Sequence, residues 1–185
     1  GVSSSIILPD LAILDPDLTL GLPAGTTAAT GIDAMVHAIE AYASSSKNNN
    51  PISKMLSIEA LKLLGGSIEK AVFEGSNVEA RGNMLAASSM GSIAFQKGLG
   101  AIHSLSHPVG SLYNTHHGLT NAVFMPYVLK KNRNAIEDKL IALSRYIELS
   151  NQSFDGFMTW ILNLRESLQI PHTLEELIHE DAKLE

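Results

Sequence analysis

Apolar residues recur every three or four positions from Thr26 onward, and runs of β-branched residues are absent there. This spacing is the period of an α-helix and does not suit the two-residue alternation of a strand. The sequence therefore predicts a mainly α, all-helical, bundle-like domain over residues 23–185. The predicted helices span residues 26–46, 52–73, 78–97, 100–112, 116–131, 134–149, 154–168 and 173–180.

The first 22 residues have a different character. Two short apolar runs, 6–8 and 11–14, are separated by prolines and followed by Gly21-Leu22-Pro23. Short apolar runs bounded by proline and glycine are typical of strands and extended chain. Residues 1–22 are therefore expected to form a short extended or β-like segment ahead of the helices.

Two predicted helices carry patterns that indicate how they pack. In the second, apolar side chains follow one another at i+3 and predict a buried stripe of Met55, Ile58, Leu61 and Leu64. The third is rich in glycine, alanine and serine, and small side chains let neighbouring helices approach closely. We therefore expect the third helix, 78–97, to lie at the centre of the domain.

The composition excludes several classes of protein. The 185 residues include no cysteine, which excludes disulfide scaffolds, zinc ribbons, iron–sulfur sites and thiol nucleophiles. The net charge is −6 and no basic run exceeds Lys130-Lys131, so nucleic acid is not an expected partner. No stretch approaches about 18 uninterrupted apolar residues, so no membrane partner is expected, and a cytoplasmic location fits best.

Histidines cluster in two segments of the chain: His37, His103, His107, His116 and His117 are five of the seven. Asp33 and His37 are i and i+4 on one predicted helix, which places their Cβ atoms about 5–6 Å apart. The residues around them are apolar, so this face is expected to be buried, and a buried carboxylate needs a metal or a cationic imidazole beside it. His103 and His107 repeat the i, i+4 spacing.

The last pair of histidines opens a predicted helix. Thr115 is the predicted N-cap, which places His116 and His117 in the first turn. The positive end of a helix favours the neutral imidazole, the form that binds metals. Adjacent helical side chains point about 100° apart, so only one of the two reaches a given centre. The residues predict a site of one aspartate and three histidines, which suits Fe(II), Zn(II), Co(II) or Ni(II) better than Ca(II) or Mg(II).

Other interpretations stay open for these residues. Asp33 and His37 could share a simple hydrogen bond on a helix face, and His107 could be a structural histidine before a proline. Glu40 and Tyr42 could support the ligands, or belong to the surface or the core. The whole chain could also be a helical interaction module without enzymatic activity. A helical metal phosphohydrolase of the HD kind is a further alternative, although that class needs an adjacent His-Asp pair and none occurs here.

Longer stretches of sequence resemble a known family. AILDPDLTL at 12–20, TGIDAMVHAIEAY at 30–42, GLGAIHSLSHP at 98–108 and YNTHHGLTNA at 113–122 closely resemble the iron-containing (group III) alcohol dehydrogenases. The resemblance extends from about Pro9 to Arg133. It implies that the four metal ligands are Asp33, His37, His103 and His117. It also implies that His107 faces substrate and nicotinamide, whereas His116 matches no ligand position.

The resemblance implies an activity as well. Such an enzyme interconverts a small-molecule alcohol and an aldehyde or ketone with NAD or NADP, and a divalent metal, Fe(II) or Zn(II), acts as the Lewis acid. His107 would be the catalytic residue that relays the hydroxyl proton, on the nicotinamide side of the site. Polyol dehydrogenases and dehydroquinate-synthase-like enzymes share the same two-domain plan and are alternatives. A homo-oligomer is the expected assembly of the full-length enzyme.

The resemblance also implies a division into domains. The family has an N-terminal dinucleotide-binding domain with a glycine-rich loop, and neither G-x-G-x-x-G nor GGGS occurs in this sequence. Residues 1–22 are therefore expected to link to a missing dinucleotide-binding domain. Residues 23–185 are expected to form the helical metal-binding domain, with its final helices cut short. The chain alone is expected to hold a metal but to lack dehydrogenase activity.

Overall fold

The computed structural model describes residues 4–7, 9–45 and 49–181. Eight α-helices form in these ranges: α1 (Ala24–Ala43), α2 (Pro51–Phe73), α3 (Val78–Ala94), α4 (Ala101–Tyr113), α5 (His117–Lys131), α6 (Arg133–Tyr146), α7 (Phe154–Ser167) and α8 (Leu174–Asp181). The predicted all-helical fold is confirmed, and each predicted helix end lies within three residues of the observed one. Residue 46, the predicted end of the first helix, lies outside the described residues.

The N-terminal segment forms 3-10 turns where extended or β-like chain was expected. Its described part contains η1 (Ser5–Ile7) and η2 (Pro16–Thr19), and no strand forms among the described residues. Leu8, at the end of the first apolar run, lies outside them. The start of η2 has a local cause, because Asp15 Oδ1 accepts the backbone N–H of Asp17 at 3.0 Å and Pro16 has a backbone angle suited to a first helical turn.

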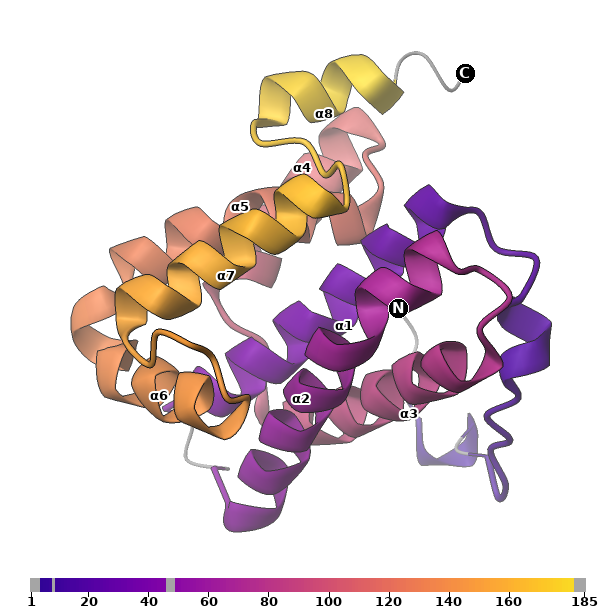
Figure 1. Cartoon of the computed structure of the whole chain (residues 1–185), viewed down its shortest axis with the longest axis horizontal. Helices are drawn as coiled ribbons and strands as arrows, with labels where there is room; N and C mark the ends of the chain where they lie inside the picture. Colours follow the sequence, from indigo (N-terminus) through magenta and orange to yellow (C-terminus); the bar gives the residue numbers. More distant parts are fainter. Residues whose placement is uncertain (1–3, 8, 46–48, 182–185) are drawn as a thin grey trace.

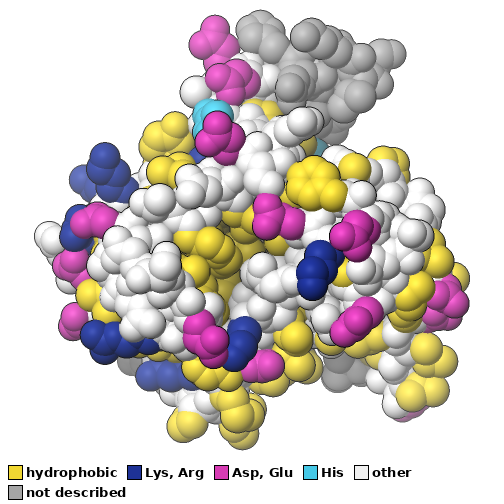
Figure 2. All heavy atoms as spheres, in the orientation of Figure 1, with side chains coloured by type: hydrophobic (Ala, Val, Ile, Leu, Met, Phe, Trp, Pro, Cys, Tyr) yellow, Lys and Arg dark blue, Asp and Glu magenta, His cyan; other side chains and the backbone are white. Residues whose placement is uncertain are grey.

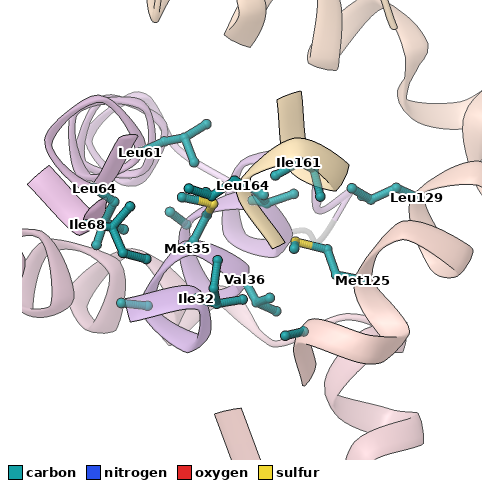
Figure 3. Packing of buried hydrophobic residues seen from close by; sticks show 14 of the residues in the cluster. Ile32, Met35, Val36, Leu61, Leu64, Ile68, Met125, Leu129, Ile161 and Leu164 are labelled. Carbon is teal, nitrogen blue, oxygen red and sulfur yellow. The ribbon is translucent and has the colours of Figure 1, made fainter. Parts of the chain in front are cut away.

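The central helix of the domain is α1, and the expectation that the third helix would hold this place is wrong. α1 packs against α2, α3 and α5, and Figure 1 shows it crossing the middle of the molecule. Its buried residues lie all round the helix axis, as expected of a helix with neighbours on every side. In Figure 3, Ile32, Met35 and Val36 of α1 meet side chains from α2, α5 and α7. The small residues of α3 serve instead to bring it close to α1.

The buried stripe of α2 differs from the predicted one at its start. Leu61 and Leu64 are fully buried, but Met55 is 59% exposed. Helical residues advance by about 100° each, so an i+3 series drifts, and Met55 lies about half a turn away from Leu64 around the axis. Ser53 and Ser57 occupy the buried line at that end of the helix instead.

The junction of α4 and α5 reverses the chain at the histidine-rich segment. α4 continues through Pro108 to Tyr113, and Asn114 then takes a left-handed conformation with φ of 54°. The N-cap of α5 is His116, so the prediction of Thr115 at this position is wrong. The hydroxyl of Thr115 lies before the helix and is paired with that of Thr120 at 2.7 Å.

The surface carries charges of both signs. On the face that Figure 2 shows, lysine and arginine side chains alternate with aspartate and glutamate side chains around a hollow lined by hydrophobic atoms. No helix within the described ranges is long and apolar enough to cross a membrane.

Candidate metal centre

Three helices bring candidate ligands to one place. Asp33 lies on α1, His103 on α4 and His117 on the first turn of α5. α5 packs against both α1 and α4. A Cβ atom at Gly118 would overlap the backbone carbonyl group of Ala29 in α1. The absence of a side chain at residue 118 therefore lets the start of α5, with His117, reach Asp33.

Ligand atoms of Asp33, His103 and His117 form one cluster. Oδ1 of Asp33 lies 3.8 Å from Nε2 of His103 and 3.7 Å from Nε2 of His117. All three atoms lie within 4.8 Å of one another. The His103 side chain is only 2% exposed, whereas that of His117 is 44% exposed. The cluster therefore has one side in the protein interior and one side open to solvent.

His37, the fourth predicted ligand, lies at the edge of this cluster. Its Nε2 is 3.9 Å from Oδ1 of Asp33, and its ring stacks on that of His103 with centroids 4.9 Å apart. The ring of Phe95 packs on His37 at a centroid distance of 4.8 Å. Nδ1 of His37 is buried without a hydrogen-bond partner among the described residues, which is unfavourable for a polar atom. The structure thus brings three predicted ligands together and holds the fourth beside the shared carboxylate.

Two further predicted residues lie outside the cluster. His107 is exposed one turn after His103, and its ring centroid is 5.8 Å from that of His103 and 5.4 Å from that of His117. His116 is exposed at the N-cap of α5. Only one of the adjacent pair His116 and His117 joins the cluster, in agreement with the angle between neighbouring helical side chains.

Asn121, which was not among the predicted site residues, lies between the candidate ligands. Its side-chain nitrogen donates to Oδ1 of Asp33 at 2.6 Å and lies 3.1 Å from Nε2 of His103 and 3.0 Å from Nε2 of His117. One amide group has two hydrogens, so it can donate to at most two of these three atoms. One carboxylate oxygen and two ring nitrogens therefore converge on the point that the amide nitrogen occupies. Asn121 follows His117 by four residues, so the i, i+4 spacing that marked the other candidates also applied to it.

Glu40 contacts the second ring nitrogen of His103. Oε2 of Glu40 accepts the Nδ1–H of His103 at 2.7 Å and the backbone N–H of Gly100 at 2.9 Å, and Oε1 accepts the backbone N–H of Ile102 at 2.7 Å. These three donors satisfy a carboxylate that is buried in the protein. Of the roles left open for Glu40, the structure favours contact with a candidate ligand, whereas Tyr42 packs on the hydrophobic core.

Burial lowers the pKa of His37 and of His117. For both rings the loss of hydration is the largest cause, the negative charge of Asp33 opposes it, and the neighbouring imidazole of His103 adds to it. A lowered pKa keeps a histidine neutral near neutral pH, and the neutral ring is the form that binds a divalent metal ion. The electrostatic environment therefore favours metal-binding protonation states at these two positions.

The donor atoms fit a first-row divalent cation. Imidazole nitrogen with one carboxylate oxygen suits iron, zinc, cobalt or nickel. Tetrahedral sites with bonds of about 2.0–2.2 Å place their ligand atoms about 3.3–3.6 Å apart. The 3.7–3.9 Å that separate Oδ1 of Asp33 from the three histidine nitrogens are slightly longer, so small side-chain movements suffice. A cation that contacts all of these atoms has to displace the amide of Asn121.

Comparison with known proteins decides the family. The profile of the Fe-containing alcohol dehydrogenase family, C-terminal region, matches residues 27–185. The chain belongs to the iron-containing alcohol dehydrogenase family. The family inferred from the sequence is therefore confirmed, together with the all-helical fold of its C-terminal region.

Individual members of the family show how much of such a protein this chain represents. The 4-hydroxybutyrate dehydrogenase of Cupriavidus necator is 48% identical over 73% of this chain and 36% of its own length. The 1,3-propanediol dehydrogenase of Citrobacter freundii is 38% identical over 92% of this chain and 45% of its own length. The solved structure of the iron-containing alcohol dehydrogenase of Thermococcus thioreducens matches 95% of this chain and 45% of its own, with a TM-score of 0.84 and 32% identity. The chain thus spans less than half the length of these relatives.

Proposed function

We propose that this chain is the metal-binding part of an NAD- or NADP-dependent alcohol dehydrogenase. The observation that carries the proposal is the convergence of Asp33, His103 and His117 within 4.8 Å in a member of the iron-containing family. The relatives named for 4-hydroxybutyrate and 1,3-propanediol support a small alcohol, or the corresponding aldehyde, as the substrate. In this proposal residues 1–22 link to a dinucleotide-binding domain and residues 23–185 hold the metal.

The four predicted ligands have distinct parts in this proposal. Asp33 supplies the negative charge, and His37, His103 and His117 supply neutral nitrogens. These residues would hold Fe(II) or Zn(II), which would supply a Lewis acid for the alcohol oxygen, and NAD(P) would supply the hydride acceptor. The exposed side of the cluster, at His117, is the side from which a substrate can approach.

His107 is the proposed catalytic residue for the proton. Its exposed ring lies beside the cluster, 5.4 Å from the ring of His117. An exposed imidazole at this position can accept the hydroxyl proton of a bound alcohol on one ring nitrogen and pass a proton to solvent from the other. The buried ring of His103 is poorly placed for this task, since it is only 2% exposed and both its nitrogens have partners.

Metal content tests the metal part of the proposal. The chain is purified without a metal-affinity column, beside a double variant Asp33→Ala/His117→Ala. The control is His172→Ala, because the His172 side chain is exposed in the segment between α7 and α8. We expect about one iron or zinc ion per chain in the wild type and the control, and loss in the double variant. A wild-type chain that stays metal-free after loading with Fe(II) and with Zn(II) would contradict the proposal.

A fusion protein tests the dehydrogenase part. The chain is joined to the N-terminal part of the Citrobacter freundii relative and screened for alcohol oxidation with NAD and with NADP. We expect turnover of a small alcohol, and its loss in a fusion that carries Asp33→Ala/His117→Ala. A fusion that folds, binds metal and binds the nucleotide, yet oxidises none of the small alcohols tested, would overturn this part of the proposal.

A further inference from the structure

We infer that Glu40 is a positioning residue, which holds the ring of His103 in the orientation and tautomer that a metal ligand needs. The inference rests on the proposed function, because the orientation of His103 matters to metal binding. Glu40 and His103 are 63 residues apart in the sequence, yet Oε2 and Nδ1 are 2.7 Å apart. A carboxylate can only accept, so the Nδ1 atom of His103 carries a proton, and in the neutral ring Nε2 keeps its lone pair.

The two nitrogens of His103 therefore face different partners. Nδ1 points to Glu40, and Nε2 lies 3.1 Å from the amide nitrogen of Asn121 and 3.8 Å from Oδ1 of Asp33. The ring is buried, and hydrogen bonding on one edge fixes which nitrogen the other edge presents. Glu40 thereby directs an unprotonated nitrogen into the ligand cluster.

The arrangement requires a carboxylate in place of an amide. Both oxygens of Glu40 accept hydrogen bonds, and the three donors are Gly100 N–H, Ile102 N–H and His103 Nδ1–H. A glutamine has one oxygen, so its NH2 group would face at least one of these donors. Glu40→Gln therefore keeps the size of the side chain but breaks the arrangement of acceptors.

The same carboxylate also ties α1 to the start of α4. The N-cap of α4 is Gly100, which has no side chain to cap the helix, and Glu40 from α1 accepts N–H groups at this end. A Cβ atom at Gly100 would lie 2.6 Å from Oε1 of Glu40, so glycine permits the close approach. The positive end of α4 further stabilises the buried negative charge. Glu40 thus fixes both the ring of His103 and the helix that carries it.

Cation affinity is the first test, with Zn(II) and Co(II) titrated against a competing chelator. Hydrogen-bond partners behind a metal ligand typically change affinity by about 10–100-fold, and we expect Glu40→Gln to weaken binding by this factor. The control is Glu176→Gln, because Glu176 also accepts two backbone N–H groups, those of His172 and Thr173, at the start of α8. The control should bind as the wild type does. Wild-type affinity in Glu40→Gln would overturn the inference.

A double-mutant cycle separates positioning from a general effect on folding. Glu40→Gln and His103→Ala are combined, and the affinity loss caused by Glu40→Gln is measured with and without the histidine ring. If Glu40 acts through His103, the loss disappears in the His103→Ala background. An equal loss in both backgrounds would show that Glu40 only stabilises the fold, and would overturn the positioning role.

The tautomer of His103 provides a test that needs no folded variant. Nitrogen-15 NMR of the metal-free wild-type chain should show Nδ1 protonated and Nε2 unprotonated at His103. Protonation of Nε2 instead would overturn the inference even if Glu40→Gln does not fold. A wild-type chain that shows the expected tautomer but binds neither Zn(II) nor Co(II) would contradict the proposed function and not the contact between Glu40 and His103, so the two failures are distinguishable.

Discussion

Gly118 of α5 lies against the carbonyl group of Ala29 in α1 so closely that a Cβ atom at residue 118 would overlap it. This backbone contact lies one residue from His117 and one helical turn from Asp33, the two candidate ligands whose atoms are 3.7 Å apart. The approach of the two helices and the approach of the two ligands therefore have the same origin. A residue with no metal-binding group of its own determines the geometry of the candidate centre.

Gly118→Ala is expected to weaken both the fold and metal binding. The added methyl group meets backbone atoms that cannot move aside easily, and such overpacking typically costs about 1–3 kcal/mol. The start of α5 has to move away from α1, which separates His117 from Asp33, so we expect at least a tenfold loss of Zn(II) affinity. Urea unfolding measures the loss of stability, and competition titration measures the loss of Zn(II) affinity.

Gly66→Ala is the matched control for this substitution. Gly66 lies inside α2, is exposed, and a Cβ atom there would have no atom within 4 Å. Alanine is favoured over glycine in a helix interior by about 0.5–1 kcal/mol, so this variant should be slightly more stable and should bind Zn(II) normally. If Gly118→Ala is as stable as Gly66→Ala and binds Zn(II) equally well, the close contact between Gly118 and Ala29 does not determine the geometry of the centre.

Asn121→Ala is expected to have opposite effects on the metal-free fold and on metal affinity. The Asn121 amide nitrogen donates to Asp33 and lies within 3.1 Å of two histidine nitrogens, and its loss removes the donor from Asp33, at a cost of about 1–3 kcal/mol. A cation no longer has to displace the amide, so Zn(II) should bind more tightly. Urea unfolding in the presence of a chelator measures the stability of the metal-free chain. Competition titration measures the affinity for Zn(II).

The control for this variant is Asn83→Ala, because the Asn83 amide donates to Ser67 at 3.1 Å, outside the ligand cluster. Asn83→Ala should leave Zn(II) affinity unchanged. Weaker Zn(II) binding by Asn121→Ala, with no change in the stability of the metal-free chain, would show that Asn121 supports the cation and does not compete with it.

The C-terminal helix provides a pH-dependent contact remote from the candidate metal centre. The pKa of Glu176 is lowered, first by the hydrogen bond from the backbone N–H of His172 and also by that of Thr173. A depressed pKa means that the contact stabilises the folded chain above the pKa of the unfolded state, and that this stabilisation is lost as pH falls through the folded pKa. An NMR titration should place the Glu176 midpoint below the ordinary glutamate value. A midpoint at or above that value would contradict the contact.

The chain by itself is expected to show no dehydrogenase turnover. Its 185 residues contain no glycine-rich loop of the kind that grips the phosphates of a dinucleotide. Metal-loaded chain, 1,3-propanediol and NAD are mixed, and the absorbance of NADH is followed, with the Citrobacter freundii relative as the positive control. Formation of NADH by the 185-residue chain would refute this expectation.

Sequence patterns predicted the helices and the principal candidate residues because both depend on local spacing. The spacing of apolar residues predicted the position of every helix. The i, i+4 spacing identified Asp33 and His37 as a candidate ligand pair. Met55 shows where such local reasoning fails, since a series at i+3 drifts around the helix and only the packed structure shows which part of it is covered.

The contacts between distant residues were not predictable in this way. Glu40 meets His103 across 63 residues, and Asn121 meets Asp33 across 88. These pairs depend on how α1, α4 and α5 pack, which no spacing within a single helix reveals. The N-cap of α5 also differed from the prediction, because the helix begins one residue later and His116, not Thr115, is its N-cap.

One divalent cation is proposed to bind where α1, α4 and α5 meet. Anomalous X-ray diffraction from crystals loaded with Zn(II) or Fe(II), recorded at the absorption edge of the metal, tests it most directly. We predict a single strong peak bonded to Oδ1 of Asp33 and to Nε2 of His37, of His103 and of His117, with the amide of Asn121 displaced. A fully loaded crystal with no peak among these residues, or with its peak elsewhere, would contradict the account.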